Sequence, residues 1–483
     1  MSAAAALLLP AIRWDANHGY TAARPAIERA LALGVGGFIL FGGDQEHVRA
    51  LTKELRIKSR VPLLIAADLE RGAGQQFAGA TGLPPLAAIA SLGDADAVRR
   101  AARLTAREAR TLGLNWDLAP VCDLDIIPEN PIVGTRSLGG DSRRVALLAQ
   151  AWIQACQAEG VLACAKHFPG HGRTRTDSHV GVPVVDASRA ELVEHDLAPF
   201  RAAIEAGVAG IMTAHVSYPA LDASGAPATM SREMLQWLLR QQMRFDGLIV
   251  TDAMIMAGAI AEHGEEEAAI RALDAGCDLL LYPNDLESVA SALDRALATH
   301  RLDAARIQTS LRRRLKWAQW SSPPNEYRRP SGTDVLWGAQ LADRVVHVVR
   351  GTPRAMKAPV DIVVVDDDLG GPFPPPSREP LLDSLFDGGW KARRLDQFDP
   401  ASKNDAVVAL FGETRAWKER VGYSESALAS VREACAAKPG ATVLQFGHPR
   451  LASQLTFASV LVSTWGGEAA MQSAAARWIM RAR

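Results

Sequence analysis

Eight short apolar runs recur along the first 283 residues of the chain, and most of them end in a polar or charged residue. They are LLLP (7–10), GGFILF (36–41), LLIAAD (63–68), LNWDLAP (114–120), LACAKHF (162–168), GIMTAH (210–215), GLIVTD (247–252) and DLLLYP (278–283). Most are separated by alanine-rich stretches of helical periodicity with a glycine near the end. Continuously apolar strands that alternate with helices indicate a parallel sheet covered on both faces. We therefore predict a closed (β/α)8 barrel, with a doubly wound open sheet as the competing architecture.

A second, smaller domain is expected after the barrel. The βα pattern stops in the proline-rich stretch SSPPNEYRRPSG (321–332), which is typical of a linker. A helix is predicted over VLWGAQLADRVVHVVRG (335–351), and further apolar runs follow at 361–368, 405–412, 441–447 and 460–466, interleaved with helical segments. This pattern predicts an α/β domain with a mostly parallel sheet. The expected organisation is a catalytic barrel over 1–320, a linker over 321–335 and a C-terminal domain over 336–483.

The composition excludes some classes of partner. Lysine and arginine number 53 against 54 aspartates and glutamates, so no net field attracts nucleic acid or an anionic membrane. No stretch reaches the roughly 18 apolar residues of a membrane span. The apolar N-terminal run has no positive region ahead of it and is interpreted as a first strand rather than a signal peptide. The balanced charge makes a small neutral ligand the easier partner. Five scattered cysteines are expected to be reduced thiols, which favours a cytoplasmic protein.

Charged residues gather where the predicted strands end. They are Asp68, Asp117, Lys166 with His167, His215 and Asp252. Any one of them alone is best interpreted as a helix cap or a turn residue. Because the carboxyl ends of barrel strands converge on one face, several such residues in separate units predict a functional site there. His215 is equally compatible with a structural role, and Asp123 is expected only to order the loop that follows it.

The loop KHFPGHGRTRTDSHVGVP (166–183) contributes most of the chemistry. Lys166 and His167 end the fifth strand and can donate hydrogen bonds to an oxygen-rich ligand. Asp177 and His179 are separated by one residue, so the carboxylate can orient an imidazole that exchanges protons near neutral pH. The glycines of the loop would let it move over a ligand. A metal site is the weaker alternative, because zinc ligands usually come at close spacing from rigid elements.

These segments resemble family 3 glycoside hydrolases of the β-N-acetylglucosaminidase branch. The loop 166–183 is similar to the signature loop of that branch, and the segments 115–141, 211–222 and 245–259 are similar to its other substrate-binding segments. The resemblance covers most of residues 5 to 350. It implies a barrel followed by an α/β sandwich and a carbohydrate substrate. No metal or cofactor is expected. For a cytoplasmic member the resemblance also implies a substrate from cell-wall recycling.

The resemblance implies a role for each site residue. Asp252 would be the nucleophile of a retaining reaction, and His179, oriented by Asp177, would be the general acid and then the general base. The hydroxyls of the terminal sugar would be bound by Asp68, Arg136, Lys166 and His167. An oxocarbenium-like transition state needs a carboxylate on one face and a proton donor on the other, and Asp252 and His179 are of the residue types that meet these two needs.

The sequence also departs from the branch. Where the branch has DxEGGRVxR, this chain has DLERGAGQQF (68–77), so Arg71, Ala73 and Gln76 replace a glycine and two arginines. These replacements change the predicted sugar-binding segment, so the sequence specifies the type of reaction more closely than the identity of the sugar. A β-glucosidase or xylosidase with Glu413 or Glu419 as its acid, a phosphorylase, and a non-catalytic sugar-binding protein all stay open as alternatives.

Overall fold

The computed structural model describes residues 4–260, 263–321, 330–368, 375–413, 417–418 and 420–481. The chain divides into two compact units. The first comprises Met1–Thr81, Ala95–Ile127 and Ser137–Ser331, and the second comprises Gly82–Asp94, Pro128–Arg136 and Gly332–Arg483. Two short segments from within the barrel sequence therefore group with the second unit. Most of the predicted linker, 322–329, lies outside the described residues.

The first unit is built on a ring of parallel strands in the order β1-β9-β8-β7-β6-β5-β4-β3-β2. Their bounds are β1 (Leu8–Leu9), β2 (Ala11–Arg13), β3 (Gly37–Phe41), β4 (Leu64–Ala67), β5 (Trp116–Asp117), β6 (Leu162–Phe168), β7 (Gly210–Thr213), β8 (Leu248–Ala253) and β9 (Leu279–Leu281). Pro10 divides the first strand in two, since proline has no N–H for a ladder. β1 pairs with β9 and β2 pairs with β3, so the ring closes across this one segment. Each of the eight predicted runs supplies a strand, and the (β/α)8 barrel is confirmed.

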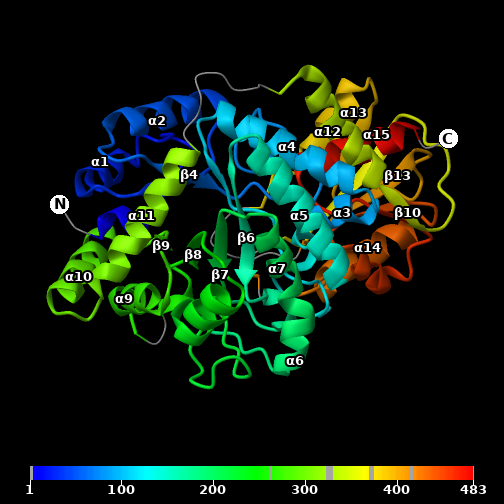
Figure 1. The fold of residues 1–483 in the computed structure, drawn as a ribbon. Helices are drawn as coiled ribbons and strands as arrows, with labels where there is room; N and C mark the ends of the chain where they lie inside the picture. Colours follow the sequence, from blue (N-terminus) through cyan, green and yellow to red (C-terminus); the bar gives the residue numbers. More distant parts are fainter. Residues whose placement is uncertain are drawn as a thin grey trace. The chain divides into compact units, whose positions relative to one another are not determined.

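Helices surround the ring (Figure 1). They are α1 (Arg24–Leu33), α2 (Gln45–Lys58), α4 (Ala95–Thr111), α5 (Ser142–Ala158), α7 (Ala198–Glu205), the π-helix η7 (Glu233–Gln242), α9 (Glu265–Ala275), α10 (Leu286–Ala298) and α11 (Ala304–Trp320). Aspartates cap α2, α5, α10 and α11 by accepting backbone N–H groups of the first turn. None of the helices in the described part of the chain is long and apolar enough to cross a membrane.

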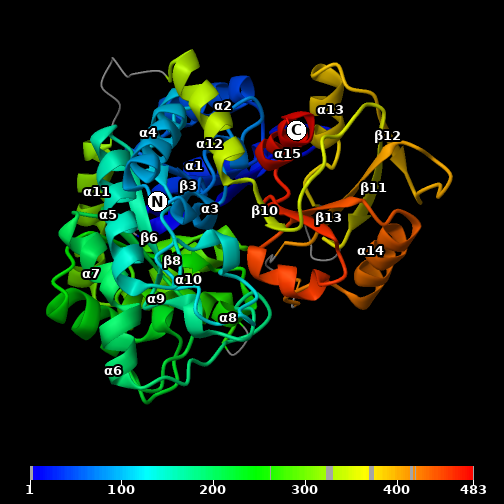
Figure 2. The same cartoon turned by 90° about the vertical axis from the view of Figure 1, so that its right-hand side faces the viewer.

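The second unit holds a six-stranded sheet in the order β10-β15-β14-β13-β11-β12. Its strands are β10 (His347–Arg350), β11 (Val360–Asp366), β12 (Ala392–Leu395), β13 (Asp405–Phe411), β14 (Thr442–Phe446) and β15 (Val460–Ser463). Only the β10–β15 pair is antiparallel. Alternate residues of β13 face α14 (Glu425–Ala437) on one side and α13 (Pro380–Asp387) with α15 (Ala469–Arg481) on the other (Figure 2). The predicted α/β sandwich with a mostly parallel sheet is confirmed.

The helix predicted over 335–351 is too long. The helix α12 ends at Val345, and the following residues form the edge strand β10 (His347–Arg350). Valines on both sides of His347 favour a strand, because branching at Cβ restricts χ1 more in a helix than in a sheet. The other edge strand, β12, contains two arginines and has no apolar run that would have revealed it.

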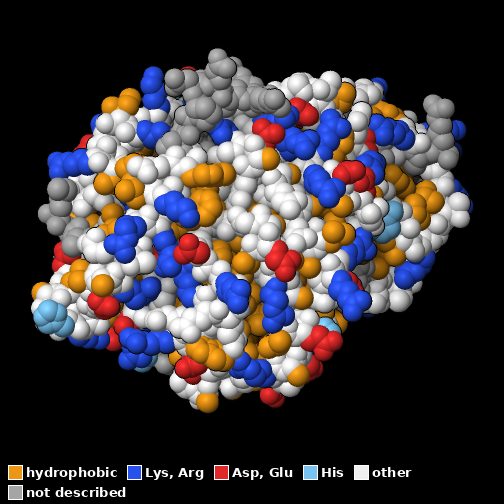
Figure 3. Space-filling view, viewed as in Figure 1, with side chains coloured by type: hydrophobic (Ala, Val, Ile, Leu, Met, Phe, Trp, Pro, Cys, Tyr) orange, Lys and Arg blue, Asp and Glu red, His pale blue; other side chains and the backbone are white. Residues whose placement is uncertain are grey.

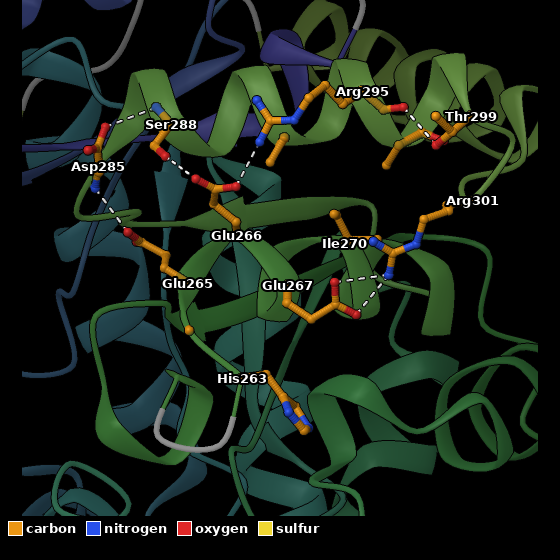
Figure 4. A pocket seen from close by; sticks show the side chains of 13 residues that line it. His263, Glu265, Glu266, Glu267, Ile270, Asp285, Ser288, Arg295, Thr299 and Arg301 are labelled. Carbon is orange, nitrogen blue, oxygen red and sulfur yellow. Dashed lines mark hydrogen bonds and ion pairs between the residues drawn. The ribbon is translucent and has the colours of Figure 1, made fainter.

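The outer wall of the barrel has a groove of about 610 Å³ between α9 and α10 (Figure 4). Its charged groups bind each other: Glu266 accepts hydrogen bonds from Ser288 and Arg295, and Glu267 accepts two from Arg301. Acidic and basic side chains are also interspersed over the face seen in Figure 3. The pairs Glu266–Arg295 and Glu267–Arg301 in the groove are largely accessible to water, so each is worth no more than about 1 kcal/mol.

A buried carboxylate connects the elements near the closure of the ring. Asp278 precedes β9 and is fully buried. One of its oxygens accepts hydrogen bonds from Arg240 of η7 and from the Ile249 N–H of β8 at 3.0 Å, and the other accepts from Ser310 of α11 at 2.7 Å. Asp278 thus joins η7 and β8 to α11, which lies more than 50 residues further along the chain.

We expect Asp278→Ala to lower the free energy of unfolding of the barrel by about 3–5 kcal/mol, because Arg240 would be left buried without its charge partner. The exposed pair supplies the control: Glu266→Ala should cost less than about 1 kcal/mol. Urea denaturation followed by tryptophan fluorescence measures both. Equal losses in the two variants would contradict the assignment of Asp278 as the residue that joins these elements.

Candidate active site

The ammonium group of Lys166 lies between two carboxylates at the mouth of the barrel. Lys166 is in β6 with its side chain only 2% exposed, and its Nζ lies 2.6 Å from Asp68 Oδ1 and 2.8 Å from Glu70 Oε1. Asp68 follows β4 and is the more accessible of the two acids, at 27% exposed. Two predicted residues, Asp68 and Lys166, are therefore in direct contact. A ligand hydroxyl at Asp68 would meet both an acceptor and a cation.

Asp117, at the end of β5, adds a third acid beside this pair. It is fully buried, and its Oδ2 accepts a hydrogen bond from the Trp152 indole N–H at 3.2 Å. Burial, together with the charges of Asp68 and Glu70, raises the pKa of Asp117 to about 7, although Lys166 opposes the shift. At neutral pH and below, much of Asp117 is protonated, so the cluster holds fewer negative charges than its composition suggests.

His167 lies between two carboxylates. Its Nδ1 is 2.7 Å from Asp123 Oδ2, and its Nε2 is 3.9 Å from Asp252 Oδ2. Asp123 is fully buried and also accepts the backbone N–H of His167. This arrangement fixes Nδ1 as the nitrogen that donates to Asp123 and turns the other edge of the ring toward Asp252. This use of Asp123 was not predicted, although its place directly after an apolar run was a signal in the sequence.

Asp252, in β8, is ionised over the whole physiological pH range. Burial acts to raise its pKa, but the charges of three histidines, His167, His215 and His179, together with a hydrogen bond from the Ala253 N–H, lower that pKa to about 2. Its side chain is 19% exposed, so a ligand can reach it. An accessible, ionised carboxylate in a ring of imidazoles is suited to attack an electron-poor carbon.

Asp177 and His179 form the dyad that their spacing predicts. The Asp177 side chain is fully buried, and its Oδ1 lies 2.7 Å from His179 Nδ1 while accepting the His179 backbone N–H at 2.8 Å. The imidazole itself is 20% exposed. Because Nδ1 is bound to the carboxylate, Nε2 is the ring nitrogen that can exchange a proton with a ligand.

Two of the loop glycines allow close packing rather than movement. A side chain on Gly172 would place its Cβ 2.0 Å from the Leu124 carbonyl oxygen, and one on Gly170 would meet Asp196 at 3.2 Å. Around Gly181, by contrast, nothing lies within 4 Å of the Cβ position. The first half of the loop is thus packed against the barrel, and only the second half has space around it.

The structure also places Arg136, Trp116 and His215. Arg136 ends the short helix η3 (Gly134–Arg136), in a segment that groups with the second unit. Trp116, in β5, is fully buried in the barrel core against Gly210. His215 is also buried and bonds to Thr229 and the Ala253 carbonyl, which matches the structural role considered for it.

Several histidine nitrogens of the loop bind groups within the protein. His171 bonds to two hydroxyl groups, while Nδ1 of His167 and Nδ1 of His179 each bind an aspartate. Across the described ranges, no group of three or more His, Cys, Asp and Glu side chains is arranged to hold a metal ion.

Known proteins are similar to this chain over the barrel. A β-N-acetylglucosaminidase/β-glucosidase of Cellulomonas fimi is 37% identical over 287 residues, which are 56% of this chain and 51% of that protein. A β-hexosaminidase of Pseudomonas aeruginosa strain PAO1 is 42% identical over 267 residues, 54% of this chain and 78% of that protein. The chain thus spans about half the length of the Cellulomonas fimi enzyme.

The similarity extends to both units in a solved structure. The family 3 β-N-acetylglucosaminidase of Paenibacillus sp. str. FPU-7 superposes with a TM-score of 0.84 at 27% identity, covering 99% of this chain and 96% of that one. Residues 21–316 match the family described as glycosyl hydrolase family 3 N terminal domain. With this match over more than half of its residues, the chain belongs to glycosyl hydrolase family 3.

Proposed function

We propose that this protein is a retaining glycoside hydrolase that removes terminal β-linked N-acetylglucosamine. Asp252 is the nucleophile, and His179, oriented by Asp177, is the acid and then the base. The observation that supports this best is the ionised carboxylate of Asp252 among three imidazoles, one of which is partly exposed and bound to a buried aspartate. The names of the relatives support the choice of sugar.

The chemistry follows from these positions in two steps. The carboxylate of Asp252 attacks the anomeric carbon while His179 Nε2–H protonates the departing oxygen, so one C–O bond forms as another breaks. The neutral imidazole then removes a proton from water, which attacks the anomeric carbon and releases Asp252. Each step inverts the anomeric configuration, and the two together retain it.

The Lys166 cluster is proposed to bind the sugar hydroxyls. Asp68 can accept from a hydroxyl while Lys166 and His167 donate to neighbouring oxygens. Arg136 is proposed as a further sugar-binding residue on the resemblance to the family alone. We extend the proposal to a cytoplasmic enzyme that acts on recycled cell-wall fragments, on the basis of the sequence.

The rival acid from the second unit is less suitable. Glu413 is 7% exposed, and its Oε1 accepts the backbone N–H of Gly467. A carboxylate used in this way stabilises a turn and is poorly placed to deliver a proton. Glu419, the other candidate, lies outside the described residues.

Comparing the hydrolysis of nitrophenyl N-acetylglucosaminide and nitrophenyl glucoside tests the substrate. We expect the N-acetylglucosaminide to have the larger kcat/KM, and a larger value for the glucoside would favour the β-glucosidase alternative. Repeating the assay with inorganic phosphate separates the phosphorylase alternative, which would release a sugar 1-phosphate.

Asp252→Asn should lower kcat by roughly 10⁴ to 10⁶, since the amide cannot form the glycosyl-enzyme. Incubating the native enzyme with a 2-fluoro-sugar and mapping the labelled peptide identifies the nucleophile directly. Label on a peptide without Asp252, together with an active Asp252→Asn variant, would overturn the assignment.

Asp117 gives a prediction about pH. Its folded pKa is about 7, well above the ordinary value of 3.8, so between these pH values the unfolded chain ionises this group while the folded protein keeps it protonated. Each rise in pH within this window therefore lowers the free energy of unfolding, and the loss is complete above pH 7. In Asp117→Asn this loss is absent, so the stability of the variant relative to the native protein should increase from pH 4 to 7.

Thermal melting of both proteins at several pH values measures this difference. Asp246→Asn is a suitable control, because the Asp246 side chain is 79% exposed and its carboxylate stays in water in both states. A difference between Asp117→Asn and the native protein that does not vary with pH would contradict the raised pKa.

A further inference from the structure

In the loop that contains the proposed acid, the N-terminal part, residues 170–174, is held in place. His171 is 1% exposed, and its backbone N–H donates to Asp123 Oδ1 at 2.6 Å. The Tyr218 hydroxyl donates to the Gly170 carbonyl at 2.8 Å, and Arg173 Nε donates to Asp196 at 2.9 Å. Residues 170–174 are therefore joined to the barrel at three points. The dyad lies further along the same loop, where the neighbouring residues Arg175, Thr176 and Val180 are exposed.

The imidazole of His171 connects residues 170–174 to the dyad. Its Nδ1 is 2.7 Å from Thr174 Oγ1, and its Nε2 is 3.0 Å from Ser178 Oγ. Ser178 is 1% exposed and stands between Asp177 and His179 in the chain. A bond to the Ser178 side chain therefore restrains both members of the dyad.

The hydrogens of this network can be assigned by counting. The Thr174 hydroxyl donates its only hydrogen to the His171 carbonyl at 3.1 Å, so its oxygen must accept from His171 Nδ1–H. Burial lowers the pKa of His171 to about 4, so the ring is neutral near pH 7 and carries a single N–H. With that hydrogen on Nδ1, Nε2 is the acceptor, and the Ser178 hydroxyl donates to it.

Ser178 is also bound from the side of the nucleophile. Its carbonyl accepts the Gly258 N–H at 3.1 Å, and Gly258 lies in α8 (Ala257–Ile260), shortly after the Asp252 strand. A side chain at Gly258 would meet that carbonyl at 2.8 Å and the Gly181 carbonyl at 3.0 Å, so only glycine allows this approach. Ser178 thus contacts both His171, in the N-terminal part of the loop, and the segment that follows Asp252.

We propose that His171 is a positioning residue, whose neutral imidazole holds Ser178 and thereby sets the position of the Asp177–His179 dyad relative to Asp252. The inference rests on the proposed function, because it assumes that His179 protonates the leaving group. Proton transfer needs the donor within about 3 Å of its acceptor, and a displacement of about 1 Å can cost on the order of 10²-fold in rate. Loss of the His171–Ser178 bond therefore affects catalysis more than binding.

The test uses aryl N-acetylglucosaminides whose leaving groups differ in basicity. A phenol leaving group needs the acid, whereas 2,4-dinitrophenolate leaves without a proton. We expect Ser178→Ala to lower kcat/KM about tenfold for the phenyl substrate and less than about twofold for the dinitrophenyl substrate. Thr176→Ala, at an exposed position in the same loop, should leave both values unchanged.

A second variant tests the imidazole itself. His171→Phe keeps an aromatic ring of similar volume and removes both of its hydrogen bonds, so it should show the same dependence on the leaving group. Because the two substitutions delete the same bond, the double variant should lose no more than His171→Phe alone. If His171→Phe does not fold, the comparison of Ser178→Ala with Thr176→Ala decides the question.

The outcomes separate this inference from the proposed function. If His179→Ala shows the dependence on the leaving group but Ser178→Ala behaves like Thr176→Ala, the positioning role of His171 is wrong and the acid assignment survives. If His179→Ala lowers kcat/KM equally for both substrates, His179 is not the acid, and both proposals are overturned.

Discussion

The buried carboxylate of Asp123 is the constraint on which the arrangement of the site depends. It accepts from His167 Nδ1 and from the backbone N–H groups of His167 and His171. Burial acts to raise the pKa of Asp123, but the two histidines and these hydrogen bonds outweigh it and keep the pKa below its ordinary value. Asp123 therefore orients the His167 ring that faces Asp252, and it also holds the N-terminal part of the loop that contains the dyad. Under the proposed function, Asp252 and His179 act on opposite sides of a sugar, and a shared buried partner such as Asp123 fixes the parts of the structure that hold them.

The Lys166 cluster shows a different solution to the same problem of buried charge. Two carboxylates contact the ammonium group of Lys166, and burial together with the charges of both acids disfavours the ionised form of Asp117. Asp117, which is the most buried, takes up the proton, while Asp68 remains the accessible acceptor. The cluster thus presents its charge where a ligand arrives and stays close to neutral where it is enclosed.

The sequence predicts the strands well because of what buries them. Barrel strands and the central strands of the second sheet are covered on both faces, so each is an uninterrupted apolar run. The edge strands β10 and β12 lack this cover and leave no such pattern, which is why one was assigned to a helix and the other was missed. The boundaries between the units are equally invisible, since segments 82–94 and 128–136 interrupt the barrel sequence.

The site is predictable where its partners are near in sequence. Asp177 and His179 are two residues apart, and their contact follows from local geometry. Asp123 and His167 are 44 residues apart, so neither their bond nor the tautomer that it fixes can be inferred without the fold. The same holds for Lys166 and Asp68, which the convergence of strands brings together without specifying the distance.

The choice of an imidazole as the proposed acid and the low pKa of Asp252 have one physical cause. A second carboxylate close to Asp252 would raise the pKa of the nucleophile by repulsion and compete with it for a proton. Imidazoles have the opposite effect: His167, His215 and His179 lower the pKa of Asp252 in spite of its burial. A nucleophile that is always ionised and a proton donor that is neutral after transfer can therefore share one small site. An imidazole in a partly exposed loop must, however, be oriented by neighbouring groups. Asp177 and the packed residues 170–174 of the loop do this for His179.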